Sequence, residues 1–262
     1  MFRYFTLWYS FFTNSLSREL EYRWHFIAQF TMDIVWYAVQ LLLFEVLFLY
    51  APTIGGINKT DMHIFLGTLF VIDAMNMTLT SHNFFAFPDL IRSGELDFYL
   101  IRPVSTVFMS SFRFPSIGSF MNLLTAISFL VYSLAQVPLA ERIPGLLIYP
   151  LFVVLGLAVM TAFQLIFMGI SVFTVGADGI QWILFTIHNF GMRPDTIYTG
   201  FFRKVLLYVF PLSLIASVPA RLLFANPDYG LIASSGMCGI AFIYASYRFF
   251  TFALTKYSGA SS

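Results

Sequence analysis

Long apolar runs alternate with short polar stretches along the chain, and five of the runs are long enough to cross a membrane. They cover residues 24–49, 62–86, 114–136, 146–173 and 230–252. A membrane-spanning helix needs about 20 predominantly apolar residues to cross roughly 30 Å of hydrocarbon. The pattern therefore predicts an all-α polytopic membrane protein in which these five runs are spans.

Residues 1–23 have a different pattern. Their apolar positions recur three or four residues apart, at Phe2, Phe5, Trp8, Phe12 and Leu16. Serine, threonine and charged residues occupy the opposite side, which is typical of an amphipathic helix lying in the headgroup layer. No small-residue cleavage site follows an apolar core, so we do not expect a cleaved signal peptide. We divide the chain into an interfacial connecting helix, 1–23, and a transmembrane domain, 24–262.

A polar stretch, residues 88–103, separates the second run from the third. Charged residues and prolines are concentrated there, although only 10% of the chain is charged. Leu90, Ile91, Leu96 and Tyr99 recur near helical spacing, while Gly94 interrupts the pattern. Proline supplies no N–H and disfavours a helical residue before it. The stretch therefore predicts two short helical turns in water, within a loop over residues 87–113.

The same stretch resembles a family signature. Its residues match G-x-L-D-x-x-L-x-R-P, which is similar to the cytoplasmic loop of one family of type-two ABC exporter permeases, and a second family-like passage runs from Arg193 and Pro194 to Pro219 and Ala220. The resemblance extends over nearly the whole chain. It implies that 87–113 is a cytoplasmic coupling loop that docks in a groove of an ATPase subunit, with Leu96, Tyr99 and Leu100 as apolar contacts. The residues implied in coupling are Asp89, Arg92, Gly94, Glu95, Leu96, Asp97, Tyr99, Leu100, Arg102 and Pro103.

Residues 174–229 have two competing interpretations. Hydropathy alone favours 205–225 as the fifth span and 180–190 as an interfacial helix, which puts eleven of the fourteen Lys and Arg residues in the cytoplasm. The resemblance instead implies that 176–195 crosses and that 194–224 forms a re-entrant hairpin in the outer leaflet, marked by Pro194, Pro211 and Pro219, with eight basic residues inside.

We favour the hairpin, because non-helical backbone is tolerated at membrane depth where protein surrounds it. Either interpretation predicts six transmembrane helices with both termini in the cytoplasm. The six helices, the interfacial helix and the re-entrant hairpin before the last span make up the predicted fold.

Composition excludes several classes of protein. Hydrophobic residues make up 59% of the chain and 33 residues are phenylalanine, whereas soluble domains are roughly 45–50% apolar. A net charge of +1 provides no basic stripe for nucleic acid. Cys238 is the single cysteine, so no disulfide joins two parts of the chain.

Catalytic motifs are missing. A phosphate-binding loop ends in Gly-Lys-Ser/Thr, but Lys59, Lys204 and Lys256 follow Asn, Arg and Thr. The four histidines are scattered, and no metal site is expected. We therefore predict that the chain is not an enzyme and holds no cofactor, and that ATP and Mg²⁺ bind in a partner subunit.

Two carboxylates are predicted to lie near mid-bilayer. Asp33 and Asp73 fall nine and eleven residues into the first two spans, which is about 13 and 16 Å at 1.5 Å per residue. A charge at that depth costs about 2.5–3.5 kcal/mol on insertion scales. With Asn76, these residues are candidates for lining a transport route. The alternative is a hydrogen bond that fixes helix packing, with Gln40, Asn76 or Gln164 as partners.

Taken with the resemblance, these observations predict the transmembrane subunit of an ATP-binding cassette exporter in the bacterial cytoplasmic membrane. The resemblance implies two permease copies, identical or related, and two ATPase subunits, with membrane lipids around them and no nucleic acid. The alternatives are a nucleotide-independent channel or receptor-like protein and an intramembrane lipid-modifying enzyme. The cargo is not determined, although the richness in Phe and Tyr favours lipid-like or amphiphilic molecules.

Overall fold

A computed structural model describes residues 2–21, 23–138, 142–174 and 179–257, and within these ranges the chain is helical with no strand beyond an isolated bridge between Ile54 and Ile57. The α-helices are α1 Phe2–Glu21, α2 Arg23–Tyr50, α3 Lys59–Asn76, α4 His82–Arg92, α5 Leu96–Leu100, α6 Thr106–Phe112, α7 Gly118–Leu134, α8 Ile143–Phe173, α9 Gly179–Gly191, α10 Gly200–Lys204, α11 Ser217–Arg221 and α12 Tyr229–Thr255. A π-helical turn, η1 (Met77–Ser81), joins α3 to α4. Three further short turns are η3 (Asp195–Ile197), η4 (Val205–Val209) and η5 (Leu212–Ile215).

Four helical segments of the described chain are long and apolar enough to cross a membrane, namely Ile27–Tyr50, Lys59–Arg92, Ile143–Phe173 and Tyr229–Thr255. They correspond to four of the five spans expected from hydropathy. The expected span 114–136 is the shorter helix α7, with 17 residues, or about 25 Å. In the region 176–195 the structure has α9, with 13 residues, or about 20 Å. Residues 176–178 lie outside the described ranges.

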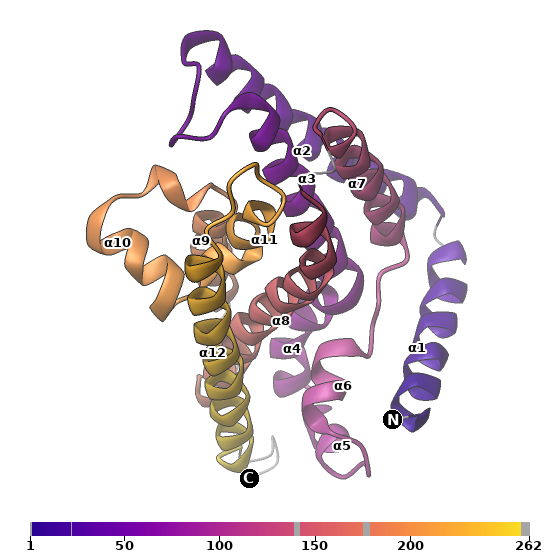
Figure 1. Ribbon diagram of the computed structural model, residues 1–262. Coiled ribbons are helices and arrows are strands. Elements are labelled where there is room, and N and C mark those ends of the chain that lie inside the picture. The colour runs from indigo at the N-terminus through magenta and orange to yellow at the C-terminus, as the bar shows by residue number, and fades with distance from the viewer. Residues whose placement is uncertain (1, 22, 139–141, 175–178, 258–262) are drawn as a thin grey trace.

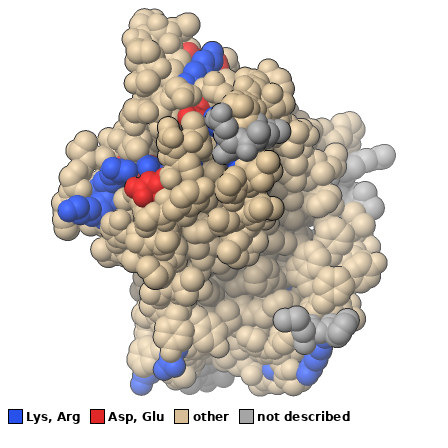
Figure 2. All heavy atoms as spheres, viewed as in Figure 1, with Lys and Arg blue, Asp and Glu red and all other residues tan. Residues whose placement is uncertain are grey.

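The bundle has two distinct ends (Figure 1). We call the lower one the α5 end, because α5 lies there with the start of α1 and the end of α12. The upper one is the loop end, where residues 51–58 join α2 to α3. On the face drawn in Figure 2, charged side chains lie at the α5 end and over the upper half of the molecule, including a group at the left over α10, and an uncharged band separates the two sets. That distribution matches a protein whose middle contacts hydrocarbon.

The second apolar run extends further than expected. The helix passes through η1 and Pro88 and ends at Arg92, so Pro88 lies inside α4 and does not begin the loop. Proline removes one helical hydrogen bond donor, and Ser93 N still donates to Asp89 O at 2.9 Å beyond it. The polar stretch is therefore the last turn of a span followed by the separate short helix α5.

A straight fifth span over residues 205–225 is wrong. That region contains only η4, η5 and α11, and each is five residues or shorter. Pro211 caps η5 and Pro219 lies within α11, where each lacks the N–H that a continuous helix needs. All of residues 211–220 are buried. We call residues 194–224 the bent segment, and its buried part belongs to the interior of the bundle.

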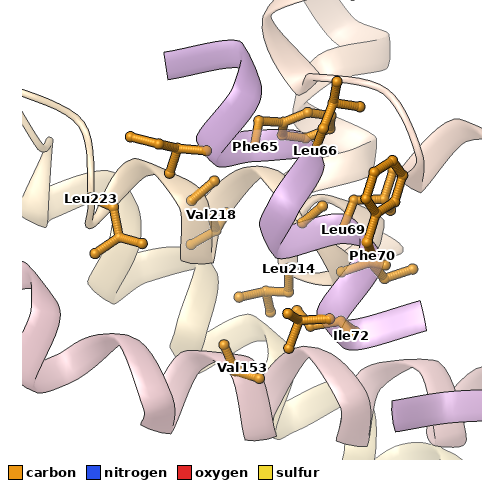
Figure 3. Packing of buried hydrophobic residues seen from close by; sticks show 14 of the residues in the cluster. Phe65, Leu66, Leu69, Phe70, Ile72, Val153, Leu214, Val218 and Leu223 are labelled. Carbon is orange, nitrogen blue, oxygen red and sulfur yellow. The ribbon is translucent and has the colours of Figure 1, made fainter. Parts of the chain in front are cut away.

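Apolar side chains form two clusters. The first surrounds α3 at the loop end and includes Phe65, Leu69 and Ile72 of α3; Ile72 lies beside Val153 of α8 and Leu214 of η5 (Figure 3). The second lies at the α5 end between α4, α5, α6, α8 and α12. The long helices pack in pairs, α3 along α7 and α8 along α12. Both clusters therefore share α8.

Glycines on α8 let the bent segment approach closely. A Cβ at Gly156 would collide with the carbonyl oxygen of Leu214, and one at Gly145 would collide with that of Leu222. Such backbone-to-backbone contact needs small residues, as it does between membrane helices generally. The two glycines therefore fix where residues 212–222 lie against α8.

Candidate functional site

A left-handed residue separates the two helices of the stretch implied in coupling, residues 88–103. Gly94 has a φ of 74°, which glycine adopts without a steric penalty. Gly94 N donates to Ile91 O at 3.2 Å and closes α4, after which α5 starts at Leu96. The expected break at Gly94 thus corresponds to a sharp turn that separates two helices.

Leu96 and Tyr99 face the inside of the chain. Their side chains are 0% and 1% exposed and belong to the second cluster, with Phe87 of α4 and Phe250 of α12. The expectation that both offer apolar surface to an ATPase is therefore corrected, since neither is accessible. Burial raises the pKa of the Tyr99 hydroxyl, and the guanidinium of Arg113 opposes part of that rise.

The exposed apolar side of α5 consists of other residues. Phe98 is 58% exposed, Leu100 is 40% exposed and Ile101, at the end of the helix, is 77% exposed. We call these three residues the α5 patch. Of the three contacts expected from the sequence, only Leu100 belongs to it. Phe98 and Ile101 were missed, although they too are separated by one helical turn.

Charged side chains surround this patch. Asp89, Arg92, Glu95, Asp97 and Arg102 are all exposed, as is Pro103. Among them, Arg92 Nη1 lies 3.8 Å from Asp89 Oδ1, a weak pair. Exposed pairs of this kind contribute at most about 1 kcal/mol. The rim is therefore polar and solvated around an apolar centre.

Helix α1 contacts the residues that follow α5. Arg3 Nη2 donates to Pro103 O at 3.0 Å, and the Tyr4 hydroxyl accepts from Ser105 N at 3.3 Å. The Tyr4 ring meets Phe108 of α6 edge to face, with centroids 5.0 Å apart. Phe5, on another face of α1, is 69% exposed. One side of α1 thus packs on the protein, and an apolar side is left uncovered in the chain.

The two membrane carboxylates have different surroundings. Asp33 Oδ2 accepts from Nδ2 of Asn122, a buried residue on α7. This supports the packing role for Asp33, through a partner that the sequence did not suggest. Asp73 is 4% exposed, and its carboxylate has no hydrogen-bond partner among the described residues. Of the two, Asp73 is therefore the carboxylate left available for a ligand.

Asn76 lies one turn beyond Asp73 in a buried hydrogen-bond network. Its Oδ1 accepts from Gln164 Nε2 of α8 at 2.9 Å and from Thr80 Oγ1 at 2.7 Å. Thr80 belongs to the π-helical turn η1. Isolated π-turns inside α-helices are frequent at functional sites. Gln164, suggested from the sequence as a packing partner, thus contacts Asn76.

Asp73, Asn76 and Gln164 line one cavity of about 130 Å³, together with Met77, Ser81, Phe84, Phe85, Met160, Phe163, Ile187, His188, Met192, Leu212 and Ile215. The bent segment closes one side of it, through Leu212 and Ile215 of η5. No pattern in the sequence predicted that His188 would line this cavity. Within the described ranges, no group of three or more His, Cys, Asp or Glu side chains is placed to hold a metal ion.

A second buried polar group holds the bent segment. Asp195 is 1% exposed and accepts from Arg221 Nη2 at 2.5 Å and from Arg203 Nε at 2.9 Å. Its backbone N–H donates to Ser217 Oγ at 3.0 Å. Pro194 precedes it and is also buried. These contacts join the beginning of the segment to its end, and no sequence motif signals them.

Comparison with known proteins gives one match. The family described as ABC-2 family transporter protein matches residues 34–261. No curated protein and no solved structure matches the chain. The family match covers most of the chain and includes α5, the cavity and the bent segment.

Proposed function

The chain belongs to the ABC-2 family of transporter proteins and is the membrane permease of an ABC transporter, and from this premise we propose that it is the membrane subunit of an exporter. In the proposal, two permease copies, identical or related, form the route and recruit two ATPase subunits. ATP and Mg²⁺ bind in those subunits. The protein is a multi-pass membrane protein. We place it in the bacterial cytoplasmic membrane with both termini in the cytoplasm.

The observation that carries the proposal is the α5 patch. Phe98, Leu100 and Ile101 project from a short helix at the α5 end of the bundle, within a ring of exposed charges. Interfaces commonly have an apolar centre, which supplies most of the affinity, and a charged rim, which favours the correct partner and orientation. We propose that this patch docks in a groove of the ATPase.

The second cluster would transmit a movement of the ATPase from α5 to the membrane-spanning helices. Leu96 and Tyr99 lie under the patch and pack with residues of α4, α8 and α12. Closely packed interiors shift as units, because they resist deformation. A push on α5 would therefore move these helices together and open the route outward as a rigid-body change.

We further propose that residues 194–224 form the re-entrant element in the outer leaflet and that α7 and α9 complete six crossings. In support, the bent segment contacts the loop end, where Arg142 Nη1 donates to Leu223 O and lies 3.2 Å from Asp61 Oδ1. The exposed apolar side of α1 supports an interfacial position for that helix.

The docking proposal is tested by copurification from membranes solubilised in mild detergent. The change is Phe98→Ala with Ile101→Ala, and the matched control is Phe201→Ala with Ile143→Ala, which removes equally exposed apolar groups far from α5. Truncating central contacts of an interface typically costs about 2 kcal/mol or more, so we expect the ATPase to dissociate at least about tenfold more readily from the first variant only. Equal recovery with both variants would exclude the α5 patch, and a wild-type chain that transports with no ATPase bound would exclude the exporter.

Topology is tested separately in a Cys238→Ser chain with a single cysteine at Tyr198 or Lys204. A membrane-impermeant thiol reagent should label both positions from outside intact cells. Labelling only after the cells are opened would place the bent segment at the cytoplasmic side.

A further inference from the structure

The cavity below the bent segment contains polar groups that the fold leaves without partners. Gln164 is 6% exposed, and its Nε2 is committed to Asn76. Its Oε1 has no hydrogen-bond partner among the described residues, and His188 Nε2 also has none there. The carboxylate of Asp73 lines the same cavity, and it has no hydrogen-bond partner among the described residues. Three polar side chains on α3, α8 and α9 thus reach one cavity with unused hydrogen-bonding capacity.

Leaving such groups unpaired is costly. A buried polar atom without a partner costs roughly 1–3 kcal/mol, and a charged group costs more. The ionised carboxylate of Asp73 and Gln164 Oε1 are hydrogen-bond acceptors, whereas Gln164 Nε2 donates to Asn76. A ligand that satisfies them must therefore donate hydrogen bonds, and one with a positive charge would also neutralise the carboxylate.

The remaining walls of the cavity are apolar, aromatic or thioether. Phe84, Phe163, Met160 and Met192 are among them. Aromatic rings attract ammonium groups placed over their faces, and methionine adapts to ligands of irregular shape. A volume of about 130 Å³ is close to that of a dry cavity, of about 150 Å³, that holds benzene. The space thus fits one ring or a short alkyl chain with a small polar head.

A ligand has a route of entry. Phe85 lines the cavity and is also 51% exposed, so the cavity reaches the surface of the chain at this side chain. Phe85 lies on α4 in the same long helix as Asp73. Entry from this side would bring a molecule first to an aromatic ring and then to the carboxylate. Amphiphilic cations suit this order of contacts.

We propose that this cavity is a binding site for an organic ammonium ion with a small apolar or aromatic group, in which Asp73 is the counter-ion and Gln164 Oε1 accepts a second hydrogen bond. Binding belongs to the permease chain alone and needs neither nucleotide nor ATPase. The proposed site therefore goes beyond the coupling function, and a failure of one proposal would not refute the other.

The first test uses the wild-type protein in lipid nanodiscs and three probes of the same shape. Benzylammonium, benzyl alcohol and benzoate differ in charge, and calorimetric titration or ligand-observed NMR measures their binding. We expect saturable binding of benzylammonium, weaker binding of benzyl alcohol and none of benzoate. Equal binding of the ammonium ion and the alcohol would overturn the proposal without any variant being made.

The second test compares two carboxylates. Asp73→Asn should weaken benzylammonium binding by about 10- to 100-fold, the range expected for a lost hydrogen bond to a charged group. Asp33→Asn is the matched control, because Asp33 lies at similar depth, contacts Asn122 and does not line the cavity. Its charge acts on Asp73 only through space, so its loss should change binding much less than Asp73→Asn does. An equal effect of both variants would show a general electrostatic influence and would refute the assigned counter-ion.

A third variant guards against a misfolded Asp73→Asn protein. Met160→Trp adds bulk to a residue that lines the cavity from α8. We expect it to abolish benzylammonium binding while the protein remains monodisperse in size-exclusion chromatography. Unchanged affinity in such a folded variant would place the ligand elsewhere.

Discussion

Replacing Asp195 by asparagine should destabilise the protein more than replacing either arginine that contacts it. Asparagine keeps the size of the side chain and the N–H donation to Ser217 Oγ, so the variant isolates the loss of charge. The guanidinium groups of Arg203 and Arg221 then lie beside a buried neutral amide instead of a carboxylate. Removing one partner of a buried ion pair costs about 3–5 kcal/mol.

The two arginines should differ from each other. The Arg221 side chain is 15% exposed and 2.5 Å from the carboxylate, whereas that of Arg203 is 33% exposed and 2.9 Å away. We expect Arg221→Gln to cost about 1.5–3 kcal/mol, as for a buried hydrogen bond to a charged group. Arg203→Gln should cost about 0.2–1 kcal/mol, because water screens it. The expected order of stability losses is Asp195, then Arg221, then Arg203.

Thermal unfolding in mild detergent measures this order, with size-exclusion chromatography reporting the fraction that remains folded. A loss of 3 kcal/mol corresponds to a fall of very roughly 6–12 °C in the midpoint for a domain of about this size. The loss of stability in the double variant of Asp195 and Arg221 should be smaller than the sum of the losses in the two single variants, because either single change already breaks the ion pair. Additive losses, or a larger loss for Arg203→Gln than for Asp195→Asn, would refute the reasoning.

Two further substitutions test the packing. Gly156→Ala should destabilise the protein by about 1–3 kcal/mol, because its methyl group meets the Leu214 carbonyl oxygen; Gly179→Ala, which meets nothing within 4 Å, is the control in the same melting assay. Leu96→Ala should cost about 2–5 kcal/mol through the cavity left in the second cluster, whereas the exposed Ile101→Ala should leave the melting midpoint unchanged. A stable Leu96→Ala protein would mean that α5 is only loosely attached.

Only part of the coupling element was predictable from the chain. The break at Gly94 follows from local chemistry, and the structure confirms it with a left-handed residue. The exposed side of α5 does not. Leu96 and Tyr99 are three residues apart, and so are Phe98 and Ile101. Both sides of this five-residue helix are therefore apolar, and helical spacing cannot tell which one the bundle covers.

The sequence by itself determined the class of the protein and the approximate course of its long helices. Run length and hydropathy are local properties, so α2 and α12 begin and end within a few residues of the expected limits. Prolines likewise predicted that residues 205–225 would not favour one straight helix.

Tertiary structure alone decided which polar groups meet. Asp33 contacts Asn122 across 89 positions, Asp195 contacts Arg221 across 26, and Gln164 reaches Asn76 across 88. Such pairs form because helices far apart in the chain pack side by side, and each buried polar group then takes the partner that the packing provides. Asp73 receives none among the described residues, and this distinction between two similar carboxylates is not present in the sequence.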